Sequence, residues 1–461
     1  MTGRVPPTRR GVIAAGLAAG GLAGHPMPAA LGREPVRARP VSPGPAAPRE
    51  TPSAQPVVLR RGINLWPWFS LTREYPAPRT DYAWPAFDPD RPVPTRADLA
   101  GLARAGFDFV RLPIDPGPFL FFTGRTRAVL FGMLDAAVAM ALAEGLTVVL
   151  NLHANAATHH YTPEALYGGP DAPLLDAYRD LVAELARALA RHPQGRVALE
   201  PVNEPPQACG AEAWGRIQAG LLGAARAAAP ALTLVATGAC GSLVDGLTAL
   251  DPAALTAFRP LLYTFHFYEP YLFSHQGAPW MDEPIYRALN AVPWPASAGR
   301  LDATLAAVRR RMAGDAALPA ARKATAYAET ELKLAEYFAA RPDRGFLDRG
   351  LAPVRAWALR HGIPTGEILL GEFGALRSDH RYVASGAADR ARYVGDVRRS
   401  AEAAGFPWAF WNLFDGMGLV QGETRSLDPA LLGALGLPAP PGGAPSGASP
   451  SGTSPSGTSS P

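Results

Sequence analysis

The sequence lacks the features that would place it in several common functional classes. Only two of its 461 residues are lysine, and its net charge of +4 arises in the first 50 residues, which carry seven arginines and two glutamates. The rest of the chain has a net charge of −1, so the basic surface expected of a nucleic-acid-binding protein is missing. No glycine-rich phosphate-binding pattern follows the first apolar segment, so a Rossmann domain has little support.

The N-terminal region also lacks a long hydrophobic run. The Gly/Ala-rich stretch 11–24 is shorter than the about 20 residues that a membrane-spanning helix needs. It follows Arg9 and Arg10 and precedes a small-residue segment, so residues 1–30 resemble a twin-arginine export signal. An ordinary secretory signal and a basic arm are the alternatives. We expect a periplasmic or extracellular protein that has no membrane anchor after signal cleavage.

Two further segments have the composition of unfolded chain. Residues 31–56 are rich in Pro, Ala and Arg, which is typical of a linker. Residues 438–461 contain no charged or aromatic side chain and repeat Pro-Ser-Gly, so they cannot bury enough apolar surface to offset the entropy lost on ordering. The sequence therefore predicts one folded unit over residues 57–437, and we expect it to be a monomer.

Within that unit, short apolar runs alternate with helical patterns. Helical spacing of Ala, Leu and Arg covers 129–144, 174–191 and 211–228. Strands are predicted at 58–64, 107–113, 147–152, 197–203, 232–237, 261–267, 367–372 and 408–412. Eight strands with helical crossovers favour an α/β fold, the (β/α)8 TIM barrel, with its site at the carboxyl ends of the strands. An open doubly wound sheet is the alternative.

A long insertion separates the sixth and seventh predicted strands. Residues 269–366 exceed what a barrel crossover needs, and they include helical stretches at 303–314 and 320–341. A long loop at the carboxyl ends of the strands usually shapes the cleft. Such a loop can narrow the groove and convert chain-internal cutting into chain-end cutting. The leading expectation is an enzyme like an endoglucanase, and the sequence leaves the choice between the two modes open.

Two glutamates end apolar runs, Glu204 after the fourth predicted strand and Glu372 at the end of the seventh. An unpaired buried carboxylate is costly, so two at matching strand ends indicate an acid/base pair in a cleft. Such a pair is what glycoside hydrolysis requires. Other polar or aromatic residues fall at the same ends of the strands: Asn64, Arg111, His153, Asn203, His266, Tyr268 and Trp411. Each alone has an ordinary structural explanation, but together they indicate a site.

The segments that carry these residues resemble glycoside hydrolase family 5, the cellulase family. Residues 200–205 read Glu-Pro-Val-Asn-Glu-Pro, similar to the family's E-x-x-N-E-P segment, and residues 370–374 read Leu-Gly-Glu-Phe-Gly, similar to its nucleophile strand. The other strand ends follow in the family's order, over about residues 57–437. The resemblance implies a retaining (β/α)8-barrel glycosidase.

The resemblance also implies a role for each residue. Glu372 is the expected nucleophile, and Glu204 is the expected general acid and then base, with a pKa raised by its ionised partner. Asn203 is expected to hydrogen-bond the sugar 2-OH, and Arg111 and Tyr268 are expected to keep Glu372 ionised. His153 and His266 are expected to line the subsite of the reacting sugar, and Trp411 is expected to stack on that sugar. Trp66, Trp68, Tyr271 and Trp280 are candidate platforms for neighbouring sugars.

Cofactors and metals are not expected. His153, His159 and His160 have no acidic or Cys partner spaced with them, so a metal site there is disfavoured. Cys209 and Cys240 follow neighbouring predicted strands, and either a disulfide or two free thiols fit the sequence. We expect an exported retaining β-glycanase that acts on β-1,4-glucan. A β-mannanase, a β-1,3-glucanase and a non-catalytic carbohydrate-binding barrel are the alternatives.

Overall fold

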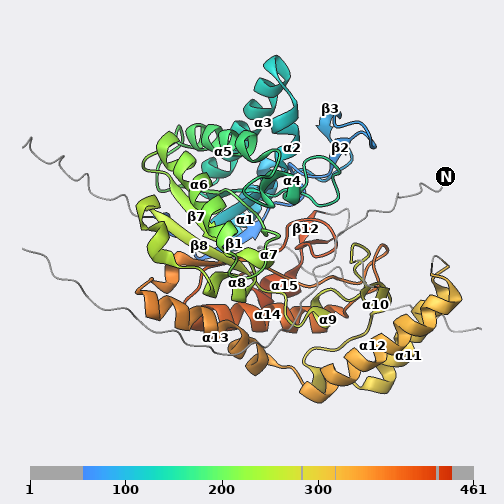
Figure 1. The fold of residues 1–461 in the computed structure, drawn as a ribbon. Coiled ribbons are helices and arrows are strands. Elements are labelled where there is room, and N and C mark those ends of the chain that lie inside the picture. The colour runs from blue at the N-terminus through green and yellow to red at the C-terminus, as the bar shows by residue number, and fades with distance from the viewer. Residues whose placement is uncertain (1–55, 282–283, 317, 422–424, 439–461) are drawn as a thin grey trace, which may run out of the picture.

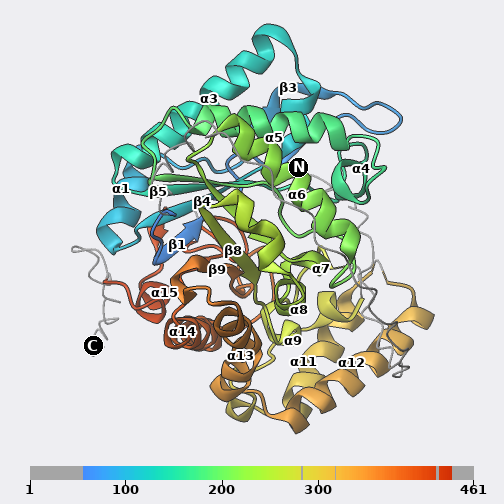
Figure 2. The same ribbon diagram turned by 60° about the vertical axis from the view of Figure 1, so that its left-hand side comes forward.

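The computed structural model describes residues 56–281, 284–316, 318–421 and 425–438. The predicted export signal and nearly all of the predicted linker and tail lie outside these residues. Eight parallel strands close into a barrel in the order β1-β10-β9-β8-β7-β6-β5-β4. Figures 1 and 2 show the helices that surround these strands. The strands are β1 (Arg61–Asn64), β4 (Phe109–Ile114), β5 (Thr147–Leu152), β6 (Val197–Glu200), β7 (Thr233–Thr237), β8 (Leu261–His266), β9 (Ile368–Phe373) and β10 (Trp408–Phe410). The (β/α)8 prediction is confirmed, and the open-sheet alternative is wrong.

The fourth barrel strand is shorter than predicted. It was expected to reach Asn203, but β6 ends at Glu200 because Pro201 follows and has no backbone N–H to donate to a neighbouring strand. The backbone N–H of Asn203 instead donates to the carbonyl of Leu152 at the end of β5, over 2.9 Å. Asn203 and Glu204 therefore lie in the loop beyond the barrel, where their side chains can face a substrate.

Helices surround the barrel, and the three predicted from helical spacing are present. They are α3 (Gly124–Ala143), α5 (Leu175–Leu189) and α6 (Glu212–Ala228), and the ring also includes α1 (Arg96–Ala105), α8 (Val244–Thr248), α13 (Arg344–His361), α14 (Ala387–Ala404) and α15 (Pro429–Ala434). Helix α1 shows how local sequence sets a boundary. Thr95 and Asp98 form a capping box at its start, and Gly106 ends it at φ 97°.

Helix α3 is unusually apolar. Among the described helices it alone has the length and composition of a membrane span. Leu130, Leu134 and Val138 are buried at a spacing of four residues, and the helix contacts β5 and α1. The helix therefore packs on the barrel along one stripe.

The interior of the barrel is filled by side chains from alternate strand positions. A separate apolar cluster there includes Phe109, Val149, Val235, Leu262 and Leu369. The Phe109 ring lies where a side chain on residue 62 would stand, 2.2 Å from the position of a Cβ, so only glycine fits in β1 at that point. This packing closes the barrel and leaves its carboxyl-terminal mouth as the place for a site.

The predicted insertion between β8 and β9 is also present, but it is shorter than residues 269–366 because α13 belongs to the barrel and packs on α14 and α8. The inserted elements are α9 (Tyr271–Ser274), α10 (Pro284–Ala288), α11 (Leu301–Gly314) and α12 (Ala320–Ala340). Helices α11 and α12 pack on each other and on α10, and they lie beyond the barrel at the lower right of Figure 1.

Two small hairpins were not predicted. One pairs β2 (Thr72–Glu74) with β3 (Tyr82–Phe87), and the other pairs β11 (Val420–Gln421) with β12 (Ser426–Leu427). They follow β1 and β10, respectively, and both lie outside the barrel sheet.

Candidate active site

The register of the barrel brings distant polar residues together at its carboxyl-terminal mouth. Asn64 at the end of β1 lies opposite Arg111 in β4, and His266 at the end of β8 lies opposite Glu372 in β9. Residue 371 in β9 is glycine, where a Cβ would stand 2.6 Å from the Thr264 hydroxyl and 3.2 Å from Nε2 of His266. These pairings place side chains from four strands over one point.

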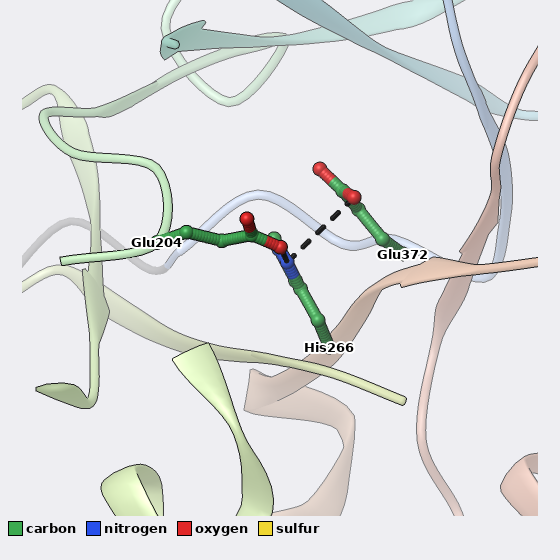
Figure 3. Close-up of side chains that lie close together, drawn as sticks. All are labelled: Glu204, His266 and Glu372. Atoms are coloured by element: carbon green, nitrogen blue, oxygen red, sulfur yellow. Dashed lines mark hydrogen bonds and ion pairs between the residues drawn. The ribbon is translucent and has the colours of Figure 1, made fainter. Parts of the chain in front are cut away.

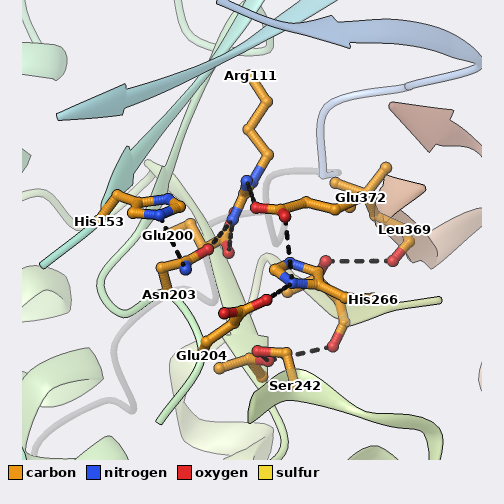
Figure 4. Close-up of polar contacts among 12 residues, drawn as sticks. Arg111, His153, Glu200, Asn203, Glu204, Ser242, His266, Leu369 and Glu372 are labelled. Atoms are coloured by element: carbon orange, nitrogen blue, oxygen red, sulfur yellow. Dashed lines mark hydrogen bonds and ion pairs between the residues drawn. The ribbon is translucent and has the colours of Figure 1, made fainter. Parts of the chain in front are cut away.

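Arg111 is the fully buried centre of this arrangement (Figure 4). Its Nε and Nη2 donate to the two carboxylate oxygens of Glu200 at 2.8 and 2.7 Å, and its Nη1 donates to Glu372 at 2.7 Å. The side-chain oxygens of Asn64 and Asn203 accept two more bonds, at 2.9 and 2.7 Å. Burial by itself would lower the pKa of Arg111, but Glu200 and Glu372 outweigh burial and raise this pKa above its ordinary value. The guanidinium therefore stays charged.

Sequence reasoning gave no role to Glu200, although its motif contains the residue. Glu200 is fully buried at the end of β6 and forms the bidentate partner of Arg111. One guanidinium thus binds two carboxylates. The bidentate bond to Glu200 fixes the plane of the guanidinium, and Nη1 donates to Glu372. The signal that could have identified it is an acidic residue at the end of an otherwise apolar strand.

Glu372 is 3% exposed and is held at both oxygens. Oε1 accepts from Arg111, and Oε2 accepts from the Tyr268 hydroxyl at 3.0 Å. Burial raises the pKa of Glu372 above its ordinary value, and the nearby Glu204 carboxylate adds to this, although His266 and Arg111 oppose it. The predicted stabilisers Arg111 and Tyr268 are therefore in contact with Glu372.

Glu204 lies at the mouth of the site, and its side chain is 43% exposed. Its backbone is left-handed at φ 44°, an uncommon conformation for a residue with a side chain and one that is often found at functional sites. Burial raises the pKa of Glu204, but the hydrogen bond from His266 and the charges of His266, His153 and Arg111 together outweigh burial and lower this pKa. The expectation of a raised pKa is therefore wrong for this arrangement.

His266 lies between the two glutamates, as Figure 3 shows. Its Nδ1 donates to Glu204 at 2.8 Å and is 3.7 Å from Glu372. Burial lowers the pKa of His266, but the two carboxylates outweigh burial and raise it. His266 was expected to line the sugar subsite, whereas the contacts of Nδ1 are with the acidic pair.

Atoms of Glu204, His266 and Glu372 lie within 4.8 Å of one another, which would also suit a metal ion. The Arg111 guanidinium already supplies the positive charge beside Glu372 and opposes a second cation. The histidine group considered from the sequence is not brought together. His153 stacks on Trp411, while the ring of His159 lies 3.0 Å from Glu74 in β2.

Three of the predicted sugar-binding residues form one aromatic group. The ring centroids of Trp66 and Trp411 are 5.6 Å apart, and the His153 ring lies 5.4 and 5.6 Å from them. Asn203 joins the group through its amide, 3.4 Å from Nε2 of His153. The prediction for Trp68 is wrong, because this ring packs beside Phe69 in the core and is only 7% exposed.

Cys209 and Cys240 form a disulfide, which settles the alternative left open by the sequence. The bond joins the loop after β6, which carries Glu204, to α7 (Ala239–Ser242) after β7. Two backbone hydrogen bonds run beside it, from Cys240 to the carbonyl of Gln207 at 2.7 Å and from Gly241 to that of Pro205 at 2.9 Å. The loop that carries Glu204 is thus joined to the segment after β7 by the disulfide and by hydrogen bonds.

Comparisons with known proteins agree with this geometry. The family model of cellulases, glycosyl hydrolase family 5, matches residues 80–416. Endoglucanase 3 of Fibrobacter succinogenes is 23% identical over 393 residues, which cover 81% of this chain and 52% of that protein. Cellodextrinase A of Ruminococcus flavefaciens is 26% identical over 230 residues, 49% of this chain and 63% of that protein.

The chain thus spans about half to two thirds of the length of these curated relatives. Among solved structures, a hyperthermophilic endo-β-1,4-glucanase in complex with substrate aligns with a TM-score of 0.59 and 22% identity. The alignment covers 82% of this chain and 97% of that chain, so the two share a fold over nearly the whole of the solved structure.

Proposed function

The chain belongs to the cellulase family, glycosyl hydrolase family 5, and from this membership we propose that it hydrolyses β-1,4-glucan with retention of configuration. The observation that carries the proposal is the close approach of Glu204, His266 and Glu372 at the mouth of the barrel, with Arg111 bonded to Glu372. A non-catalytic binding barrel would have no need to hold two carboxylates this close together.

In the first step, Glu372 attacks the anomeric carbon and the glycosidic C–O bond breaks. Arg111 and Tyr268 keep the attacking carboxylate ionised, because a cation and a donor both favour its charged form. Glu204 gives a proton to the departing oxygen. Since its pKa is lowered, that proton must reach Glu204 before the step, and His266 at 2.8 Å is the adjacent donor.

In the second step, Glu204 acts as a base. It accepts a proton from water as the water oxygen attacks the anomeric carbon, and the bond to Glu372 breaks. The lowered pKa of Glu204 favours this role, because a base must be ionised when the water arrives. The sugar leaves with its original configuration after two inversions.

The carboxylate spacing supports retention over inversion. An oxygen of Glu204 and one of Glu372 lie within 4.8 Å, close to the about 5–5.5 Å typical of retaining enzymes. Inverting enzymes need about 6.5–9.5 Å to admit a water molecule between the pair.

For the substrate, support comes from the named relatives, an endoglucanase and a cellodextrinase, and from the aromatic group of Trp66, His153 and Trp411. Sugar rings pack their C–H faces on such rings. A reducing-sugar assay on soluble β-1,4-glucan, β-1,3-glucan, mannan and xylan tests the proposal. We expect the highest kcat/KM on β-1,4-glucan, and a preference for mannan or β-1,3-glucan would overturn the substrate assignment.

We further propose that the enzyme is exported to the periplasm or beyond and works as a monomer without a cofactor. The disulfide supports export, because such bonds persist in oxidising compartments. Cell fractionation tests the location. Replacing Arg9 and Arg10 with lysine should trap the protein inside the cell if the twin-arginine route is used.

A further inference from the structure

A buried acidic cluster lies under the hairpin of β2 and β3 and is distinct from the two catalytic glutamates. Asp115 is 1% exposed and follows β4 at the start of α2 (Pro116–Phe121), and Figure 1 shows the hairpin beside this helix. Thr72 and Glu74 alternate in β2, so their side chains lie on the same face, and that face is the less exposed one. The Thr72 hydroxyl donates to Oδ2 of Asp115 at 3.4 Å. This face of β2 is therefore turned toward Asp115.

Tyr82 in β3 completes the cluster. It pairs directly with Glu74 across the hairpin, so the two side chains share one face. Its hydroxyl lies against the start of α2, where a Cβ on Gly117 would stand 2.0 Å from the Tyr82 oxygen and 3.1 Å from Oδ1 of Asp115. Oxygen atoms from two strands of the hairpin and from the segment after β4 thus converge.

Two of these oxygen atoms are buried without a partner. Among the described residues, neither Oε1 of Glu74 nor the hydroxyl oxygen of Tyr82 makes a hydrogen bond. The Glu74 side chain is 9% exposed and Tyr82 is 4% exposed, so bulk water does not take the place of a partner. Buried polar atoms in folded proteins are normally bonded. The two unpaired oxygens therefore indicate a ligand that binds between them and Asp115.

The cluster also has too little positive charge. In the part of the chain that the structure describes, no arginine or lysine pairs with Asp115 or Glu74, and the His159 imidazole contacts the other oxygen of Glu74, Oε2, at 3.0 Å. Burial raises the pKa of Asp115 to about 7; the bond from the Gly117 N–H opposes this, and the charge of Glu74 adds to it. A carboxylate in such a place needs a proton or a cation to neutralise it.

We propose that Asp115, Glu74 and Tyr82 bind a calcium ion that holds the hairpin against the start of α2. All of the donors are oxygen atoms, which hard cations prefer. Ca²⁺ accepts an irregular set of such atoms, completed by water, whereas Mg²⁺ demands an octahedron. The sequence predicts no metal, because these ligands come from separate segments. The ion is structural, takes no part in the chemistry of Glu204 and Glu372, and does not depend on the proposed function.

The test compares melting temperatures of the full chain in EDTA, in CaCl2 and in MgCl2. Two carboxylates suit a Kd of about 10⁻⁴–10⁻³ M, so about 10 mM CaCl2 should raise the melting temperature of the wild type by about 3 °C, and MgCl2 should raise it less. Asp115→Asn keeps an acceptor for the Gly117 N–H but loses the charge, and its melting temperature should not respond to calcium. Asp81→Asn is the matched control, because this carboxylate of the same hairpin bonds to Arg79 outside the cluster.

Two further measurements locate the ion. Calorimetric titration with CaCl2 should give a Kd that is at least about tenfold weaker in Asp115→Asn and unchanged in Asp81→Asn. Hydrogen exchange of the wild type should slow with calcium in residues 72–87, which form the hairpin. Exchange in α11 and α12, far from the hairpin in the chain, should stay the same.

An absent calcium response in the wild type, or an equal response in Asp115→Asn, would overturn the site. An equal response to MgCl2 would overturn the assignment to calcium. A melting temperature that depends on pH but not on calcium would show that a proton neutralises Asp115 and would also overturn the proposal. If Asp115→Asn is unfolded, Glu74→Gln decides, because it should lose the same calcium response.

Discussion

The strand ends and the loops around them solve different problems in this molecule. At the strand ends, Arg111, Glu200, Glu372 and His266 are buried on separate strands. Arg111 donates to both glutamates, and His266 lies 3.7 Å from Glu372 as an ion pair. Around them, the insertion contributes half-buried aromatic rings held by backbone bonds. The strand ends hold the charged groups and their protons in place, and the loops supply apolar faces. The charged network therefore depends on barrel register, whereas the aromatic rings depend on the loops.

The strongest way to break this comparison is to remove the nucleophile. Glu372→Ala should lower kcat by about 10⁴-fold or more, because no covalent intermediate can form. The fold should persist, since Arg111 keeps its two bonds to Glu200. Turnover on an aryl glycoside and a circular dichroism melt measure both effects. Near-normal hydrolysis by the folded variant would rule out Glu372, and Glu367→Ala, at the start of the same segment, is the control.

Loss of the acid should have a smaller and more selective effect. Glu204→Ala should slow substrates with poor leaving groups by about 10²–10⁴-fold, and it should spare the first step for activated aryl glycosides, whose departure needs no proton. Azide should restore turnover and give a glycosyl azide of β configuration. Product analysis by NMR would show an α azide if the mechanism were inverting instead.

The pH profile sharpens the role assigned to the residues beneath Glu372. Activity needs ionised Glu372, so it is lost as the pH falls through the pKa of this group, which burial raises above its ordinary value. Tyr268→Phe removes a donor to the charged form, which raises that pKa further, and the acidic limb of kcat/KM should move to higher pH. This variant is cleaner than Arg111→Met, which would also leave the buried Glu200 without its cation.

Tyr271→Phe is the matched control for this experiment. The ring of Tyr271 lies 6.3 Å from that of Tyr268, so it is a neighbour of similar size. The hydroxyl that donates to the Glu372 carboxylate is that of Tyr268. The acidic limb of the control should stay in place. An unmoved limb in active Tyr268→Phe would show that Tyr268 serves packing and does not tune Glu372.

The sequence predicted the barrel and the position of the site because both depend on local patterns. Apolar runs specify buried parallel strands, and polar residues at their ends must meet once the barrel closes. Pairings between side chains are a different matter, because they depend on angles that no local pattern contains. The bidentate bond of Glu200 to Arg111, the contact of His266 with Glu204 and the burial of Trp68 are three such cases.

Removal of the disulfide should have the smallest effect on activity. It tests whether the loops around the strand ends contribute mainly to stability. The bond closes 31 positions of chain, so its removal in Cys209→Ala/Cys240→Ala should cost about 3–4 kcal/mol of unfolding free energy and lower the melting temperature. The hydrogen bonds from Cys240 and Gly241 are made by backbone and survive the substitution, so the Glu204 loop should keep its place. At 25 °C we expect kcat to change by less than about threefold, because Glu372 is held by the strand ends and the remaining backbone bonds keep the Glu204 loop in place. Reduction of the wild type with dithiothreitol should reproduce the stability loss, and a large fall in kcat in a folded double variant would show that the loops also position Glu204.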